Sequence, residues 1–425
     1  MTATRKTRQG LLRIIGPGLL VAATGVGAGD LATGALTGTK LGVAVLWAVL
    51  VGALIKLILN EGLARWQLAT GQTILEGVIL RPRRTLSRII QSVFLIYLLL
   101  WSYFVASALM SACGIAAHAM FPLLGSAGSD KILYGMAHSV LGVVLVLSGG
   151  YKLIEKIMSI CIAVMFVTVV TTAMMVGPDW SQVAAGLVTP RIPPGGLVWT
   201  IALAGGVGGT LTVLCYGYWI REKGRSGPEA IRTCRIDLAT AYAFTAIFGI
   251  SMVIIGSTIT VEGKGAGLIV SLADKLTASP LGAGGRWVFL IGAWCALLSS
   301  LLGVWQAVPY IFADFCNITR RQKPGQGLES ESKPVHTRQW AYRGYLFSIA
   351  VLPMVGLFFS FTQVQKIYAV FGAMFMPLLA TALLFLNNHK HWVAAKMRNR
   401  MITNIFLVAT VILFLVAAVF LVWKP

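Results

Sequence analysis

Eleven apolar runs, each long enough to cross a bilayer, follow one another along this chain of 425 residues. A helix of about 20 apolar residues spans the hydrocarbon core of a membrane and satisfies its own backbone there. Charged residues are only 12% of the chain, about half their share in a soluble domain. The sequence predicts an all-α integral membrane protein, a single transmembrane domain over 1–425. The runs fall at about 14–38, 41–64, 87–119, 133–150, 153–177, 196–220, 231–260, 285–316, 341–361, 364–387 and 401–423.

The positive charge of the chain is placed as a membrane would orient it. The net charge is +21, from 35 Lys and Arg against 14 Asp and Glu. Most basic residues lie before the first run and in every second segment after it, which the positive-inside rule assigns to the cytoplasm. We therefore expect a multi-pass protein of the cell membrane with a cytoplasmic N-terminus and an outer C-terminus. Nucleic acid is not needed to explain the charge, so the expected partners are the lipid bilayer and a small cation or solute.

The chain lacks the motifs of an enzyme or of an ATP-driven pump. It has no Walker sequence, no pattern typical of a nucleophile with its base, and no CxxC pair among its six cysteines. Its His and Cys residues do not have the spacing of a metal centre. We expect neither enzyme activity nor a cofactor, and the sequence does not indicate an oligomeric state.

Asp30 is the only carboxylate deep inside any of the runs, and it follows Gly25, Gly27 and Gly29. A charge at membrane depth is unfavourable and marks a functional site by default. Glycines let a helix unwind and free its carbonyls beside the charge, as in the substrate sites of many secondary transporters. Asp30, as a metal ligand, and an oxygen of Gly27 can then hold a cation. Alternatively, Asp30 forms a salt bridge with Lys56, or that lysine extends to the cytoplasmic interface.

The sixth run carries a second glycine cluster, at 205–209, followed by hydroxyl residues. We expect this segment to be unwound, so that Thr210, Thr212 and Tyr216 offer oxygen atoms to a substrate. The alternatives are close helix packing for the glycines and hydrogen bonds to their own helix for the hydroxyls.

The two glycine clusters fall at matching positions if the chain contains two inverted repeats, at about 14–177 and 196–387, with an extra helix at 401–423. Interrupted helices at matched positions of two halves point to a binding site near the middle of the membrane. The pattern therefore predicts that helices 1 and 6 are discontinuous and together form the site.

Polar residues near the ends of the runs have simpler explanations. Arg221 and Glu222 follow an aromatic residue at the end of the sixth run, which is typical of a membrane interface, and a cytoplasmic gate is the alternative. Asp237 and Asp314 lie near cytoplasmic ends, where we expect them to be hydrated. Gln306, inside the eighth run, is expected to hydrogen-bond between helices.

Four short stretches occur in order along the chain: GPGLLVA at 16–22, LARWQLATGQ at 63–72, GYKLIE at 150–155 and LSSLLG at 298–303. They resemble the GPGFLVA, ARLGxxTGK, GxRKLE and QSSTxTG motifs of the Nramp metal-ion transporters. The resemblance extends from the first run to the eighth. It implies a LeuT-like fold of five plus five helices in inverted repeat, and a transporter of divalent metal ions.

The metal-site motifs of that family are altered, so the resemblance is to a divergent member. The family's DPGN aligns with GAGD at 27–30, which replaces the ligand Asp by Gly and places an acid at the Asn position. The family's MPH aligns with TVL at 212–214, without the Met ligand and without the His linked to proton movement. Acids that serve proton movement align with Ala108 and Ser111. The resemblance therefore implies the scaffold, but neither a soft metal site nor tight proton coupling.

The hypothesis that follows is a secondary transporter that works by alternating access without tight proton coupling. Its substrate is a small cation, a divalent metal ion similar to Mg²⁺, because a site built from oxygen atoms without sulfur favours hard cations. Two alternatives stay open. One is transport of a small organic solute on the same fold, and the other is a membrane scaffold that transports nothing.

Overall fold

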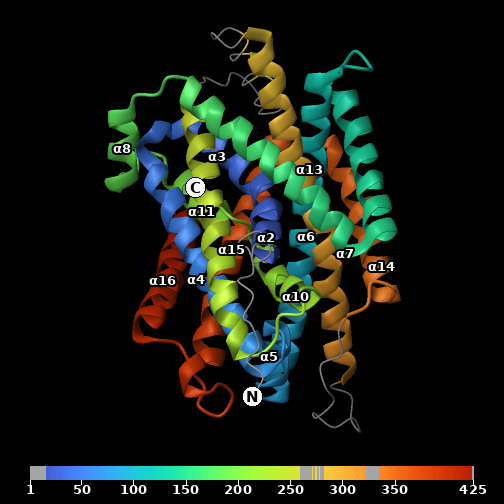
Figure 1. The fold of residues 1–425 in the computed structure, drawn as a ribbon, viewed down its shortest axis with the longest axis vertical. Helices are drawn as coiled ribbons and strands as arrows, with labels where there is room; N and C mark the ends of the chain where they lie inside the picture. Colours follow the sequence, from blue (N-terminus) through green and yellow to red (C-terminus); the bar gives the residue numbers. More distant parts are fainter. Residues whose placement is uncertain are drawn as a thin grey trace, which may run out of the picture.

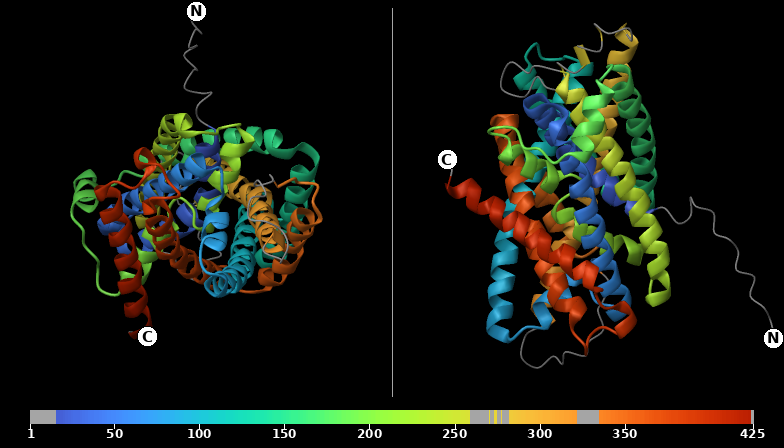
Figure 2. Two further views of the ribbon diagram at one scale, coloured as in Figure 1. Left: turned by 90° about the horizontal axis from the view of Figure 1, so that it is seen from below. Right: turned by 90° about the vertical axis from the view of Figure 1, so that its left-hand side faces the viewer.

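The computed structural model describes residues 16–258, 270, 273–274, 277, 282–321 and 335–423 of the chain. These residues fold into one elongated bundle of helices (Figures 1 and 2). The all-α class that the sequence predicted is confirmed. The residues at both ends and those at 322–334 lie outside the described residues, and the predicted orientation stays a prediction.

The helices follow the predicted runs closely. In the first half they are α2 (Pro17–Gly25), η1 (Val26–Thr33), α3 (Gly34–Leu41), η2 (Gly42–Val45), α4 (Leu46–Thr70), α5 (Ile74–Leu80), α6 (Arg84–Met120), α7 (Ala127–Met175) and α8 (Trp180–Val188). In the second half they are α9 (Leu197–Gly206), η3 (Leu211–Leu214), α10 (Cys215–Glu222), η4 (Pro228–Ala230), α11 (Ile231–Ser257), α13 (Gly282–Arg321), α14 (Trp340–Val351), η5 (Leu352–Phe358), α15 (Phe361–Asn388), η6 (Ala395–Met397) and α16 (Met401–Trp423). η1 is a π-helix and the other η elements are 3-10 helices.

Nine stretches of the described residues are long and apolar enough to cross a membrane. Besides the stretch from Leu197 to Glu222, which Gly208 and Gly209 interrupt, two of the nine contain a glycine with non-helical angles. Gly42, with φ 65°, separates α3 from η2 and α4, and Gly150, with φ 56°, lies inside α7. The breaks fall at or near the boundaries that the sequence predicted between neighbouring runs, and the division into eleven spans stays a prediction, as do the limits of the two repeats.

The end of α4 shows how the sequence sets an element boundary. The helix runs to Thr70, and Gly71 follows with φ 71°, the left-handed conformation that ends many helices. Thr73 then begins α5 with a capping box: its hydroxyl accepts from the Glu76 N–H, and the Glu76 carboxylate accepts from the Thr73 N–H. The pattern of apolar runs does not predict α5 or α8, because both are much shorter than a membrane span.

The interrupted helices pass through the middle of the bundle. Helix α2 packs against α11 and α13, and α10 packs against α2 and α13 (Figure 1). On one side α13 packs against α7 and α6, and on the other α15 packs against α16. Helix α16 lies on the outer flank (Figure 2) and is the least buried of the nine stretches. The fold therefore places the two segments with glycine clusters where surrounding helices shield them.

Candidate functional site

The first interruption is a change of helical winding around Asp30. Helix α2 ends at Gly25, η1 follows as a π-helix, and α3 continues from Gly34. The Gly34 N–H donates to the carbonyls of Asp30 and Leu31, so the backbone stays hydrogen-bonded where the sequence predicted unwinding. Single π-helical turns are rare and are frequent at functional sites. The chain therefore shifts its helical register here without opening the helix.

The second interruption is an open break. Helix α9 ends at Gly206, and Gly208 and Gly209 have φ values of 75° and 90°. Glycine is the residue that adopts such angles at little cost, which explains the cluster that the sequence places there. The backbone is not helical over 207–210, and η3 and α10 resume the helix afterwards. This is the unwound segment that the sequence predicted in the sixth run.

The two interruptions touch at Gly25. A Cβ atom on Gly25 would lie 2.5 Å from the backbone nitrogen of Gly209 and 2.6 Å from the carbonyl carbon of Gly208. Asp30 completes the junction, because its Oδ2 accepts a 3.3 Å hydrogen bond from the Gly208 N–H. Asp30 is 0% exposed, and its Oδ1 has no hydrogen-bond partner within the described part of the chain. A buried carboxylate oxygen without a donor calls for an explanation, and a bound cation is one.

Lys56 of α4 lies at the same open break and is 0% exposed. Its Nζ donates to the carbonyl oxygens of Ala204 and Gly205, at 2.9 and 2.7 Å, in the last turn of α9. The predicted extension to the cytoplasmic interface is wrong, because these carbonyls bind the ammonium inside the bundle. Among the described residues no ion pair within 4.0 Å joins it to Asp30, which binds the same break at the Gly208 N–H. The break holds one negative and one positive side chain.

Two of the three hydroxyl residues predicted to face a substrate lie at the break. The Thr210 Oγ1 accepts a 2.8 Å hydrogen bond from Nε1 of Trp101 of α6, and both residues are fully buried. Thr212 is 2% exposed in η3. Tyr216 belongs to a different cluster, since its hydroxyl donates to Oδ2 of Asp237 at 3.2 Å. The structure therefore brings Thr210 and Thr212 to Asp30's neighbourhood and places Tyr216 beyond it, in α10.

Gly27 lies in η1 against α13. A Cβ atom on Gly27 would lie 2.5 Å from the Cβ of Ser300, and the Ser300 hydroxyl donates to the Thr24 carbonyl at 2.5 Å. The sequence did not predict this donor. It also missed the hydrogen bond of 2.5 Å from Asn60 of α4 to the hydroxyl of Tyr242 of α11. An amide inside an apolar run was the available signal for that pair.

Asp237 holds the start of α2 and is buried, not hydrated as the sequence predicted. Its carboxylate accepts from the backbone N–H groups of Gly16 and Gly18, at 3.2 and 3.0 Å, and from Nη1 of Arg225 at 2.7 Å. The first N–H groups of a helix have no partner in the helix itself and favour a negative charge. One carboxylate therefore joins α2 to α11 and to the loop after α10.

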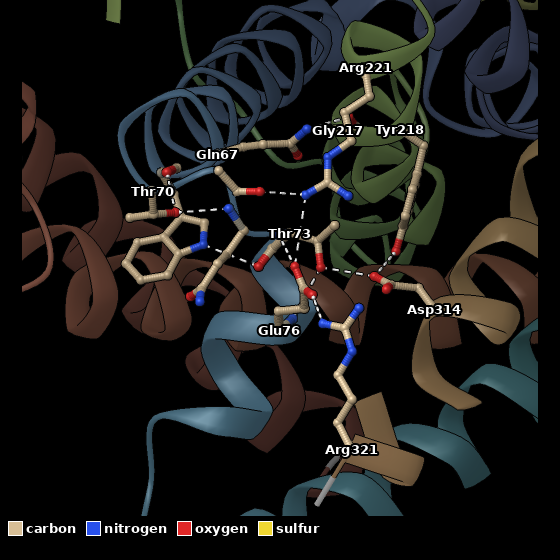
Figure 3. Close-up of polar contacts among 12 residues, drawn as sticks. Gln67, Thr70, Thr73, Glu76, Gly217, Tyr218, Arg221, Asp314 and Arg321 are labelled. Carbon is tan, nitrogen blue, oxygen red and sulfur yellow. Dashed lines mark hydrogen bonds and ion pairs between the residues drawn. The ribbon is translucent and has the colours of Figure 1, made fainter. Parts of the chain in front are cut away.

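A second polar cluster joins α5, α10 and α13 (Figure 3). Asp314 of α13 accepts hydrogen bonds of 2.8 Å from the Thr73 hydroxyl and 2.8 Å from the Tyr218 hydroxyl. Asp314 is 3% exposed, so the prediction that it is hydrated is also wrong. Hydroxyl groups from two other helices replace water as its hydrogen-bond donors.

Arg221 and Glu222 both take part in contacts between helices. Figure 3 shows Arg221 and Arg321 directed at the Glu76 carboxylate from α10 and α13. The N–O distances of these two ion pairs are 3.8 and 2.9 Å. Glu222 accepts a 2.9 Å hydrogen bond from the Tyr310 hydroxyl of α13. Gln306, also of α13, accepts from the Trp219 indole at 2.7 Å, which confirms its predicted role between helices. These contacts join α5, α10 and α13.

The chemistry available at the junction is that of oxygen ligands. Within the described residues no three His, Cys, Asp or Glu side chains come together. Asp30 offers one carboxylate, and the break offers carbonyl and hydroxyl oxygens, which are ligands for hard cations such as Mg²⁺ and Ca²⁺. All side chains named at the junction are buried, so a bound ion there would be shielded from water.

The chain is similar to several known proteins. A family model described as natural resistance-associated macrophage protein-like (Nramp) matches residues 18–424. The chain is 23% identical over 306 residues to the divalent metal cation transporter MntH of Verminephrobacter eiseniae, covering 70% of this chain and 67% of that protein. A mutant of the manganese transporter of Eremococcus coleocola has a TM-score of 0.74 at 18% identity, covering 100% and 91% of the two chains. MhsT in complex with L-phenylalanine has a TM-score of 0.60 at 14% identity, covering 98% and 99%. The solved structures show that the fold is that of LeuT-like transporters.

Proposed function

The chain belongs to the Nramp family, whose members are transporters and not enzymes, and on that premise we propose that it moves a divalent metal cation across the cell membrane by alternating access. The proposal is carried by one observation: Asp30 is fully buried where the two interrupted helices meet, and one of its oxygens has no partner among the described residues. The names of the relatives, a divalent metal cation transporter and a manganese transporter, support a metal ion as the substrate.

We further propose that the ion is a hard one, similar to Mg²⁺. The residues near Asp30 offer carboxylate, hydroxyl and backbone oxygens, whereas Cys and Met side chains are the ligands that select softer metals. Thr210 and Thr212 lie at the open break, and Gly27 lies in the same π-helix as Asp30. We assign the metal to Asp30 together with oxygens of these three residues.

A flux assay in proteoliposomes tests this function. Uptake of Mg²⁺, Ca²⁺, Mn²⁺ and Fe²⁺ is measured for the wild type and for Asp30→Asn, which keeps the size of the side chain and removes its charge. We expect Mg²⁺ flux in the wild type and a loss of about 100-fold or more in the variant, because a carboxylate in a poorly screened site attracts a cation far more strongly than an amide does. Glu229→Gln removes an exposed acid and should leave flux unchanged. Equal flux through Asp30→Asn would contradict the proposal.

Transport without tight proton coupling is the next part of the proposal. Ala108 and Ser111, which align with acids used for proton movement in the family, are 0% exposed and do not titrate. A proton path through a membrane protein uses carboxylates or imidazoles. A pH-sensitive dye inside the liposomes should therefore report no acidification that follows the metal gradient, and a robust metal-dependent acidification would refute this part alone.

The proposed orientation rests on the basic residues, with the N-terminus in the cytoplasm and the C-terminus outside. Epitope tags placed before Met1 and after Pro425 test it in intact cells. The second tag should be accessible to antibody without permeabilisation and the first should not. Tags accessible on the same side would contradict the eleven spans.

A small organic solute is the second candidate substrate. The observation that favours it is that Lys56 and Asp30 both bind the open break, since one positive and one negative group suit a molecule that carries both charges. The solved structure of MhsT, of the same fold, contains L-phenylalanine. Labelled amino acids are therefore added to the flux panel, and their uptake without any metal uptake would favour this candidate.

A further inference from the structure

Lys56 is held by backbone oxygens of the kind that bind a transported cation. Its ammonium donates to the carbonyls of Ala204 and Gly205 at the end of α9. The last carbonyls of a helix lack partners in the helix and carry partial negative charge. In transporters with interrupted helices, such carbonyls coordinate cations. The side chain of Lys56 therefore occupies two ligands that an incoming ion would otherwise find free.

The position of Lys56 is fixed by close contact between α4 and α9. A Cβ atom on Gly52, one turn before Lys56, would lie 2.5 Å from the carbonyl oxygen of Ala204. Only glycine allows the two backbones to approach so closely. Since α4 is a continuous helix there, its contact at Gly52 directs the next turn toward the open break. Lys56 is thus held inside the bundle by packing as well as by its two hydrogen bonds.

The charges at the break affect the free energy of the conformational change that carries the empty binding site across the membrane. Asp30 and Lys56 are both 0% exposed, and both bind the backbone of the same break, Asp30 at Gly208 and Lys56 at Ala204 and Gly205. A lone charge buried away from water is strongly unfavourable, and a nearby opposite charge offsets this. With Lys56 present, the site has no net charge when no metal is bound. Without it, the empty transporter would have to carry the bare carboxylate of Asp30 through its conformational change.

We propose that Lys56 is the resident counter-cation of the transport site, a specificity-determining residue that neutralises Asp30 when no metal is bound and competes with the metal for the oxygens of the break. The proposal rests on the proposed metal transport. It has two consequences. The metal binds more weakly than a lone carboxylate would bind it, and the empty site returns across the membrane readily, so the protein supports net flux and not only exchange.

Lys56→Gln tests both consequences, because the amide can donate to the same carbonyls but carries no charge. Mg²⁺ transport is measured in proteoliposomes as exchange, with metal on both sides, and as net flux into empty liposomes. The Mg²⁺ concentration that gives half-maximal exchange should fall about tenfold or more. The reason is that the variant lacks a positive charge that repels the metal ion in a poorly screened site. Net flux should fall about tenfold relative to exchange, because the empty site is now charged.

Two controls separate charge from structure. Lys56→Arg keeps the charge and should keep the wild-type ratio of net flux to exchange, and Lys152→Gln changes an exposed lysine and should change neither quantity. An unchanged half-maximal concentration and an unchanged ratio in Lys56→Gln would overturn the proposal. If Lys56→Gln does not fold, Asp30→Asn combined with Lys56→Gln leaves no stranded carboxylate and should fold. If neither the single nor the double variant folds, the role of Lys56 is purely structural, and the proposal is also overturned.

A stability measurement distinguishes failure of this proposal from failure of the proposed function. Thermal melting in detergent is compared for Asp30→Asn, Lys56→Gln and the double variant without any metal. If the two charges neutralise each other, the double variant should lose less stability than the two single variants together. Additive losses would overturn the role of Lys56 even if metal is transported. If the losses are coupled but the protein moves no metal in exchange or in net flux, the charge pair is supported and only metal transport is refuted.

Discussion

The two interrupted helices are both rich in glycine, yet only one of them opens. The first carries Gly25, Gly27 and Gly29 and stays wound as a π-helix through η1. The second, at Gly208 and Gly209, leaves the helical conformation entirely. Glycine content therefore permits an interruption in both helices and does not decide its form.

The partners supplied by other helices account for the difference. At the open break, Asp30 accepts from the Gly208 N–H and Lys56 donates to the Ala204 and Gly205 carbonyls. Charged groups thus satisfy backbone atoms that no helix turn satisfies, and such hydrogen bonds are stronger than those between neutral groups. At the first interruption the hydroxyl of Ser300 is the side-chain donor, to one carbonyl. The open break is stabilised by buried charges, and the wound one largely stabilises itself.

The largest effect is expected where the two interruptions meet. Gly25→Ala would place a Cβ atom 2.5 Å from the Gly209 nitrogen, and backbone cannot move aside as a flexible side chain can. We expect a loss of about 3 kcal/mol in the free energy of unfolding, as overpacking of a core produces, together with loss of metal flux. Gly128→Ala in α7 is the matched control, since nothing lies within 4 Å of its Cβ position. Equal stability of both variants would show that the interruptions do not need to touch.

The next effect concerns the start of α2, which the buried carboxylate of Asp237 holds by two backbone hydrogen bonds. Asp237→Asn weakens the hydrogen bonds to the start of α2 and leaves Arg225, with a side chain only 10% exposed, without its carboxylate partner. We expect a loss of about 2 kcal/mol, the range for hydrogen bonds to charged groups. Chemical denaturation in detergent measures it. Glu229→Gln, at an exposed acid, is the control, and a stability equal to that control would mean that α2 is not held by Asp237.

The positions of the membrane spans could be predicted from the sequence because they depend on the local composition of the chain. The run predicted at 231–260 forms α11 over Ile231–Ser257, and the run predicted at 401–423 forms α16 over Met401–Trp423. A helix of apolar residues is favoured in a membrane wherever it lies in the fold. The same reasoning finds the open break, since a cluster of glycines is local too.

The contacts of the site could not be predicted, because they join segments far apart in the chain. Lys56 and Ala204 are separated by 148 residues, and Gly16 and Asp237 by 221. Composition identified Asp30 and Lys56 as buried charges but not the carbonyls that receive the ammonium. Tyr216 was assigned to the substrate because it follows the glycine cluster, whereas the turn of α10 directs its hydroxyl to Asp237.

A smaller effect is expected from the hydroxyl at the open break. Thr210→Val keeps the shape of the side chain and removes the acceptor of the Trp101 indole N–H, which is fully buried. A buried donor left without a partner costs about 1–3 kcal/mol, and we expect about 1.5 kcal/mol. Trp101→Phe leaves a cavity of its own but removes the stranded N–H, so the loss in the double variant should be smaller than the sum of the two single losses. If the two changes are additive, the hydrogen bond does not hold the break.

The smallest effect is expected at the first interruption. Ser300→Ala removes the hydroxyl that donates to the Thr24 carbonyl, and Ser299→Ala is the matched control, since its hydroxyl donates to Ala296 within α13. Because η1 retains helical hydrogen bonds, we expect Ser300→Ala to cost about 0.5–1 kcal/mol, the net value of one neutral hydrogen bond. The comparison of denaturation midpoints between the two variants isolates the contact with η1. A loss as large as that of Thr210→Val would mean that the first interruption depends on side-chain partners as strongly as the open break does, and the contrast between the two helices would then lie in their glycines after all.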